Sequence, residues 1–231
     1  MFEREHHRRV AMVLEALDAQ ALASKGCLFG GGTAIALRFG EYRESVDIDF
    51  LVSDLGGYKQ LRQQLTGPEG LRAITRSGHA LNQVREIRAD QYGIRTLLHM
   101  DSISIKFEIV LEGRIELEAP AEDDRICGVA TLTPLDMVTS KLLANSDRWR
   151  DDAVLSRDLI DLAMMAPPKP LLQRAIVKAE RAYGDSVRAD LEAAIQDLRA
   201  RPHRLDRCMQ EMRMNTLSKA ALWARIRSLK N

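Results

Sequence analysis

The sequence predicts an α/β protein in two parts, with an α/β domain at about residues 1–132 and a helical domain at about residues 133–231. Residues 46–52 and 102–111 alternate between apolar and polar side chains, which indicates strands with one buried face. From Thr133 onward such alternation disappears and helical periodicity continues along the chain. This change of period places the boundary near residue 132.

The first part is expected to begin with a helix and a glycine loop. Apolar residues recur at helical spacing over about residues 3–24, which predicts one amphipathic helix. Gly30-Gly31-Gly32 then precede a second helix that starts at Thr33. Further elements expected here are a helix, two strands and a charged hairpin or loop, at residues 58–65, 94–100, 102–111 and 112–127.

The second part is predicted to be a succession of helices. They are expected at about residues 134–146, 151–165, 170–182, 184–200, 203–213 and 216–230. Pro167-Pro168-Lys169-Pro170 makes a firm break among them, because proline cannot continue a helix interior. We expect the many arginines near the end to form a solvated face, with a tRNA-binding stripe as the weaker alternative, and Trp149 and Trp223 to pack.

Composition and charge limit the classes of protein to which the chain can belong. With 34 Lys+Arg against 33 Asp+Glu, the net charge of +1 indicates no nucleic-acid partner, so any such binding needs a local basic face. Cys27, Cys127 and Cys208 are odd in number and far apart, which predicts reduced thiols. The sequence shows neither a bilayer-spanning stretch nor a secretory signal. His6 and His7 are expected at the protein surface. We therefore expect a cytoplasmic protein with no membrane partner.

The chemistry is expected at Asp47 and Asp49. On a strand, residues i and i+2 point to the same face, so the two carboxylates lie together while Ile48 and Phe50 face the core. Two neighbouring anions repel each other at neutral pH and therefore favour a cation. Hard oxygen ligands suit Mg²⁺ or Mn²⁺. The pattern predicts a metal site on the polar face of this strand.

The glycine loop and a second strand extend this predicted site. Gly31 and Gly32 leave backbone N–H groups accessible at a helix N-terminus, an arrangement that favours phosphate oxygens. Thr33 is expected to cap that helix and to donate its hydroxyl to phosphate. Glu108, on the polar face of residues 102–111, is the candidate third carboxylate.

A structural interpretation of the same residues is also possible. A lone Asp-x-Asp on a strand is often an exposed edge, and three glycines are often only a tight turn. Two features favour the site: Asp47 and Asp49 interrupt an apolar run, and loop, helix and strand follow in the order that brings them to one end of a sheet.

Two segments carry a more specific pattern, Gly31-Gly32-Thr33-Ala34-Ile35-Ala36-Leu37 and Arg43-Glu44-Ser45-Val46-Asp47-Ile48-Asp49-Phe50. Together they resemble the first motif of the AbiEii/AbiGii-type nucleotidyltransferase toxins, members of the DNA polymerase β-like superfamily. The resemblance implies a polymerase β-like nucleotidyltransferase domain with a mixed sheet, followed by a helical domain that closes the nucleotide cleft.

The resemblance continues to about residue 165. Lys106-Phe107-Glu108 is similar to the strand that carries the family's third acidic position, and the region from Pro134 to Asp161 is similar to its second motif. In that motif one helix carries Lys141 and a later one carries Arg157-Asp158-Leu159-Ile160-Asp161.

The resemblance implies a role for each matching residue. Asp47 and Asp49 would hold the metal ions, with Glu108 as third ligand or as base for the acceptor hydroxyl. Lys141 would pair with the triphosphate. Activity would involve Asp158 or Asp161, with a surface ion pair between Arg157 and Asp161 as the alternative. Arg43 and Ser45 would contact phosphate, or else order the turn before the strand.

The function expected is transfer of a nucleoside monophosphate from an NTP to an acceptor, with release of pyrophosphate. The resemblance implies the toxin of a toxin–antitoxin or phage-defence pair, with a cognate antitoxin and with tRNA or another nucleic acid as acceptor. The alternatives are a small-molecule or protein acceptor, or a catalytically silent nucleotide-binding module.

Overall fold

The computed structural model describes residues 2–230, which form two compact units. The sheet unit consists of the chain up to Arg38 together with Ser45–Thr133. The helical unit consists of Phe39–Glu44 together with the chain from Pro134 onward. The main division thus lies beside the change of period in the sequence, but the short segment Phe39–Glu44 joins the helical unit, which the sequence did not predict.

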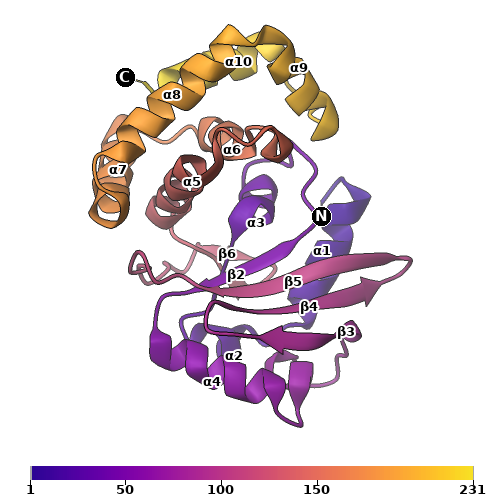
Figure 1. The fold of residues 1–231 in the computed structure, drawn as a ribbon. Helices are drawn as coiled ribbons and strands as arrows, with labels where there is room; N and C mark the ends of the chain where they lie inside the picture. The colour runs from indigo at the N-terminus through magenta and orange to yellow at the C-terminus, as the bar shows by residue number, and fades with distance from the viewer. Residues whose placement is uncertain (1, 231) are drawn as a thin grey trace. The chain divides into compact units, whose positions relative to one another are not determined.

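The sheet unit is built on a five-stranded mixed sheet with the strand order β1-β2-β5-β4-β3, which confirms the predicted fold class (Figure 1). Its strands are β1 (Leu28–Gly30), β2 (Ile48–Val52), β3 (Asn82–Ala89), β4 (Gly93–Met100) and β5 (Ile103–Leu111). A separate pair consists of β6 (Arg125–Ile126) and β7 (Val129–Ala130). Strands β2 and β5 run parallel, whereas the other neighbouring pairs are antiparallel.

Helices flank this sheet. They are α1 (Glu5–Ala16), α2 (Ala19–Ala23), α3 (Gly31–Arg38) and α4 (Leu55–Thr66), with a short 3₁₀ helix at Gly70–Ile74. The core between sheet and helices includes three aromatic rings on adjacent strands. Phe50 lies 5.6 Å from Phe29 and 5.6 Å from Phe107, measured between ring centroids, and all three are buried. Because they occupy neighbouring positions on β1, β2 and β5, they fix the register of the strands that carry the acidic residues.

Several local features of this unit differ from the predictions. The single helix over residues 3–24 is two helices, because Asp18 accepts a hydrogen bond from the Ala21 N–H and so starts α2. Strand β3 was not predicted, since nearly all its side chains are exposed at a sheet edge and show no apolar alternation. His7 was expected at the surface but is fully buried.

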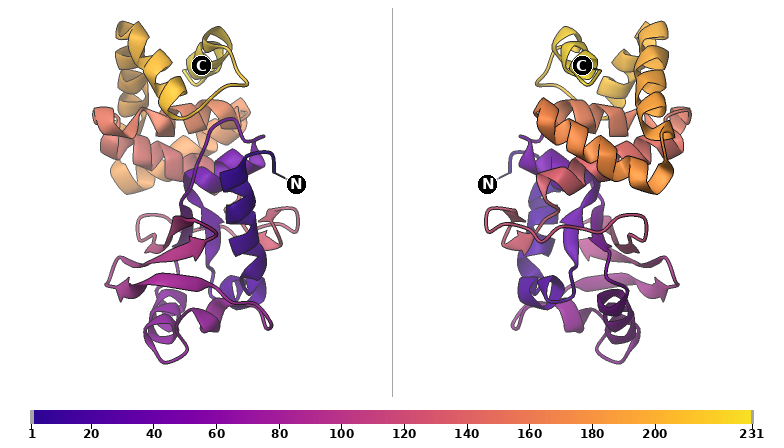
Figure 2. Two further views of the ribbon diagram at one scale, coloured as in Figure 1. Left: turned by 90° about the vertical axis from the view of Figure 1, so that its right-hand side faces the viewer. Right: turned by 90° about the vertical axis from the view of Figure 1, so that its left-hand side faces the viewer.

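The helical unit contains six α-helices, seen from two sides in Figure 2. They are α5 (Pro134–Arg148), α6 (Arg157–Met165), α7 (Lys169–Tyr183), α8 (Ser186–Ala200), α9 (Pro202–Glu211) and α10 (Lys219–Ser228), with a 3₁₀ turn at Asp152–Val154. Each corresponds to a helix expected from the sequence, although α6 begins later than residue 151. In residues 2–230 no helix has both the length and the apolar character needed to cross a bilayer.

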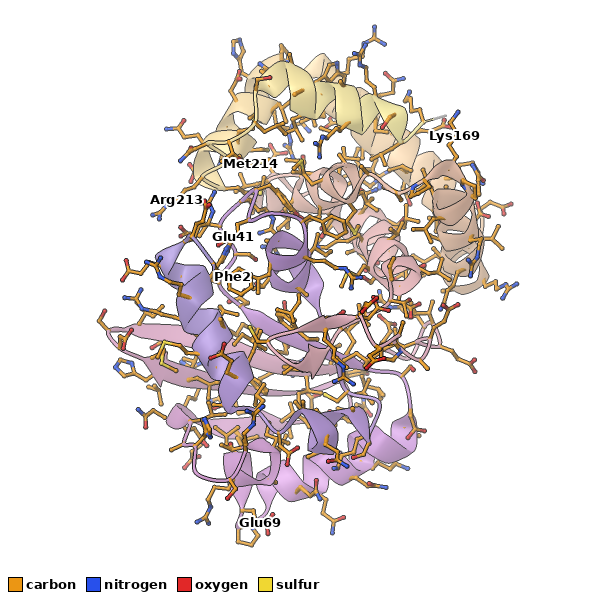
Figure 3. The ribbon with its side chains drawn as sticks, turned by 180° about the vertical axis from the view of Figure 1, so that it is seen from behind. Phe2, Glu41, Glu69, Lys169, Arg213 and Met214 are labelled. Carbon is orange, nitrogen blue, oxygen red and sulfur yellow. The ribbon has the colours of Figure 1, made fainter. Side chains whose placement is uncertain are left out.

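The segment Phe39–Glu44 is held to the helical unit by specific bonds. The Glu44 N–H donates to the Met212 carbonyl, and Arg213 donates to the Glu44 carboxylate. Figure 3 shows Glu41 of this segment close to Arg213. A stretch that lies between α3 and β2 in the sequence is therefore bonded to the end of α9.

Candidate active site

Asp47 and Asp49 lie at the start of the central strand β2. Ile48 and Phe50 are fully buried, whereas Asp47 and Asp49 are partly exposed, as the alternation predicts. Asp47 directly precedes the strand, and Asp49 pairs in parallel register with Glu108 on β5. Register alone therefore brings the predicted third carboxylate beside Asp49.

The glycine loop lies directly against Asp49. Gly30 pairs with Asp49 across the antiparallel strands β1 and β2, and helix α3 begins at the next residue. Gly31 has φ +66°, and a Cβ atom there would lie 2.6 Å from Asp49 Oδ2. Only glycine fits this position, because both the backbone angle and the carboxylate exclude a side chain. The loop thus brings a helix N-terminus next to the carboxylate.

Thr33 and Ser45 hold the loop to the approach of β2. The Thr33 hydroxyl donates to Ser45 Oγ at 2.8 Å, and the Ser45 N–H donates to His7 Nε2 at 3.2 Å. Thr33 is buried and is the third residue of α3, with Gly32 preceding it. The expectation that Thr33 caps the helix is therefore wrong, because the helix already begins at Gly31. His7 is a positioning residue that sequence reasoning missed.

Glu108 is held by two cations from the same sheet. Arg95 on β4 and Lys106 on β5 both donate to its carboxylate. Burial favours the neutral acid, but these two partners outweigh it, so the pKa of Glu108 lies below its usual value. Arg95 is a further residue that sequence reasoning missed. Its signal was a basic side chain directly opposite Glu108 in the hairpin β4–β5.

Lys106 links the three carboxylates electrostatically. Burial disfavours its ammonium, yet the hydrogen bond to Glu108 and the charges of Glu108, Asp49 and Asp47 outweigh this and raise the pKa of Lys106. The charges of Asp47 and Asp49 thus favour the charged form of Lys106. This observation and the hard oxygen donors fit a divalent ion. Among residues 2–230, however, the structure brings no three potential metal-ligating side chains into the geometry of a metal site.

The remaining predicted residues belong to a buried ion network in the helical unit. Lys141 on α5 donates to Asp158 at 2.8 Å and lies 2.6 Å from Asp161 Oδ2. Arg43 binds Asp161 with two nitrogens, at 2.7 and 3.0 Å. Arg148 binds Asp158 in the same two-pronged way, also at 2.7 and 3.0 Å. Three cations therefore share two carboxylates.

The buried network also includes Tyr42, whose hydroxyl donates to Asp161. Burial raises the pKa of Asp161, but Arg43 and Lys141 outweigh it and lower the pKa below its usual value. The pKa of Asp158 is likewise lowered, by Lys141 and Arg148 against burial. For Lys141, burial favours the neutral amine, whereas Asp158 and Asp161 raise its pKa. Asp158, Asp161 and Lys141 are thus charged near neutral pH, whereas burial and the charge of Asp161 raise the pKa of Tyr42 and keep its hydroxyl neutral.

The network bears on two interpretations that the sequence left open. Asp161 has no exposed surface and pairs with Arg43 and Lys141, so the suggested surface ion pair with Arg157 is wrong. Arg43 lies four residues before Asp47 in the chain, and its guanidinium is bonded to Asp161. This bonding favours the ordering role for Arg43 over a phosphate contact.

Comparison with known proteins agrees with these features. The family model described as "Nucleotidyl transferase AbiEii toxin, Type IV TA system" matches residues 13–228. The chain belongs to this family. It is therefore a nucleotidyltransferase of a type IV toxin–antitoxin family, as the resemblance of the motifs implied. The match extends through the last helices, where the resemblance seen in the sequence had faded.

Two solved structures from Helicobacter pylori share the fold. One, named a "putative nucleotidyltransferase from H. pylori", has 17% sequence identity and a TM-score of 0.54, covering 97% of this chain and 93% of its own. The other, JHP933, has 17% identity and a TM-score of 0.52, covering 100% of this chain and 94% of its own. No curated protein matches the chain. At this identity the two structures show the fold and no more.

Proposed function

We propose that this nucleotidyltransferase transfers a nucleoside monophosphate from an NTP to a nucleic-acid acceptor, with tRNA as the leading candidate, and releases pyrophosphate. The proposal rests chiefly on one observation: the glycine loop and the acidic strands meet at Asp49. Gly31 fits against the Asp49 carboxylate, and Asp49 is in register with Glu108. A phosphate-binding loop beside paired carboxylates is what transfer from a triphosphate needs.

In this proposal Asp47 and Asp49 would hold Mg²⁺ or Mn²⁺. The bound metal would neutralise triphosphate charge and activate the attacking hydroxyl. Gly31 and Gly32 offer their N–H groups to phosphate oxygens at the start of α3. Glu108 serves as third ligand or as base for the acceptor hydroxyl, and either role requires it to exchange the bonds that it makes to Arg95 and Lys106.

The helical unit has a separate part in the proposal, which is to close over the bound nucleotide. Lys141 would then pair with the triphosphate, and Asp158 would support activity by holding Lys141. Both side chains are buried and bonded to each other, so Lys141 must exchange an acidic partner for phosphate.

Ser45, in the sheet unit, would contact phosphate through the hydroxyl that now accepts a bond from Thr33.

A transfer assay tests this proposal. Each of the four NTPs, labelled at the α-phosphate, is supplied with total tRNA, total protein or an aminoglycoside, with and without Mg²⁺. We expect label on tRNA only, dependent on Mg²⁺, and lost in Asp47→Ala and Asp49→Ala. Asp101→Asn is the matched control, because Asp101 is an exposed acid of the same unit that binds Arg9.

The outcomes separate the alternatives. Label on an aminoglycoside or on protein would keep the chemistry and change the acceptor. NTP binding indifferent to Mg²⁺, with no transfer, would favour a silent module. If Asp47→Ala and Asp49→Ala were both as active as the unmodified protein, the mechanism would be wrong.

The biological role is proposed to be that of a cytoplasmic toxin with a cognate antitoxin. Membership in a type IV toxin–antitoxin family supports it. Expression of the unmodified protein should arrest the growth of bacteria, and expression of Asp49→Ala should not. Harmless expression of an active enzyme would contradict the toxin role and leave the chemistry intact.

A further inference from the structure

A basic groove lies between helices α8 and α10 of the helical unit. Figure 1 draws these two helices in orange and yellow. The groove contains about 870 Å³ of space, part of it open to solvent. Helix α8 contributes Gln196 and Arg199, helix α10 contributes Trp223 and Arg227, and Lys230 follows α10. The groove therefore combines three cations with one aromatic ring, and none of the residues that line it is acidic.

Several basic residues near the groove are neutralised by acids of the protein, and the two groove arginines are not, in the part of the chain that the structure describes. Arg201 and Arg204 bind Asp152, and Lys219 binds Asp206. Within residues 2–230, by contrast, Arg199 and Arg227 form no ion pair. Cations that are not neutralised by the protein leave a local positive potential that favours an anionic ligand. This is the local basic face that a net charge of +1 requires for nucleic-acid binding.

Helical spacing arranges these side chains around the tryptophan. Trp223 and Arg227 are four residues apart and so lie on one face of α10, while Gln196 and Arg199 lie three apart on α8. Trp223 was expected to be a packing residue, and the structure shows it partly exposed and lining the groove. An accessible indole flanked by arginines is suited to stack a base whose phosphates contact the arginines.

We propose that this groove binds single-stranded nucleic acid, with a base stacked on Trp223 and phosphates paired with Arg199 and Arg227. Gln196 can donate and accept hydrogen bonds at a base edge. Unpaired bases are required, because a base inside a duplex does not offer its face to an aromatic ring. The inference rests on the proposed function only in taking this strand to be part of the acceptor.

The first test measures binding without NTP or metal. A fluorescein-labelled single-stranded RNA 12-mer is titrated with protein, and anisotropy is followed at several salt concentrations. We expect Arg199→Gln/Arg227→Gln to weaken binding about tenfold and to reduce the slope of log Kd against log salt by about 1.4, since each phosphate contact contributes about 0.7 for a single strand. Arg181→Gln/Arg207→Gln removes the same charge from exposed positions outside the groove and should change Kd less than twofold.

The second test reports on the tryptophan itself. The chain has two tryptophans, so Trp149→Phe leaves Trp223 as the only one. We expect the 12-mer to quench this fluorescence and heparin, which lacks bases, to quench it far less. Trp223→Ala should weaken RNA binding about tenfold. If the control variant weakens binding as much as the groove variant, or if RNA leaves Trp223 fluorescence unchanged, the proposal is wrong.

The two proposals fail in different ways. If RNA binding depends on the groove but no label is ever transferred, the proposed enzymatic function is wrong and the assignment of the groove stands. If transfer depends on Asp49 while the groove variants bind and modify RNA normally, the groove assignment is wrong and the enzyme remains.

Discussion

The two charged clusters of this chain use similar side chains in different surroundings. In the sheet unit, Asp47 and Asp49 are partly exposed, and the Lys106 side chain bound to Glu108 is 47% exposed. In the helical unit, Asp158 and Asp161 are at most 2% exposed. Solvent lets Asp47 and Asp49 exchange partners at small cost, whereas breaking a buried pair leaves an uncompensated charge. The comparison suggests an accessible ligand site in one unit and, in the other, a buried network that anchors the fold and releases Lys141 to phosphate only at the cost of a buried ion pair.

The sequence does not reveal this difference. Both clusters contain carboxylates two or three residues apart beside basic residues, and both lie in motifs that resemble the family. Burial separates them, and so does distance along the chain, since Arg43 reaches Asp161 across 118 positions. The predictions below test whether the two clusters differ in the way that we infer.

The largest effect is expected from Asp161→Asn. It leaves Arg43 and Lys141 buried with too little negative charge, and the free energy of unfolding should fall by about 3–5 kcal/mol. Urea denaturation measures it. Asp49→Asn should change the same quantity by less than about 1 kcal/mol, while transfer falls about 10³-fold. Equal stability of Asp161→Asn and the unmodified protein would show that the buried network is not an anchor.

The acid limb of the stability profile should come from the helical unit. The folded-state pKa values of Asp158 and Asp161 are lowered, so the stability they contribute is present above the unfolded carboxyl pKa of about 3.9 and is lost as the pH falls below it. We expect the free energy of unfolding to drop between about pH 5 and pH 2. In Asp161→Asn this drop should be shallower, and in Asp49→Asn unchanged. A steeper loss of stability with falling pH in Asp161→Asn would contradict the assignment of the acid limb to the buried carboxylates of the helical unit.

The smallest effect is expected at Lys106, whose ammonium competes with a metal for the same carboxylates. Lys106→Met should tighten Mn²⁺ binding about three- to tenfold, measured by the loss of free-ion signal in electron paramagnetic resonance. Lys219→Met is the matched control, because Lys219 is similarly exposed and binds Asp206 in the other unit. Weaker Mn²⁺ binding in Lys106→Met would mean that the lysine supports the metal rather than competes with it.

The sequence by itself determined most of the elements and pointed to the carboxylates of the proposed acidic centre. Alternation around Ile48 and Phe50 gave β2 its buried face, and helical periodicity predicted each helix of the helical unit, because these patterns depend on residues close together in the chain. Edge strand β3 lacked such a pattern and was missed. The placement of Glu108 beside Asp49 was anticipated, since both are on polar faces of strands.

Tertiary structure alone decided which charged side chains are buried in ion pairs and which are accessible to solvent. It buried His7 against Ser45, attached Phe39–Glu44 to the helical unit, and paired Arg43 and Lys141 with Asp161. It also left Arg199 and Arg227 unpaired around Trp223 within the described residues. The physical reason is that desolvation and ion pairing depend on neighbours in space, and the residues that provide them here lie tens of positions away in the sequence.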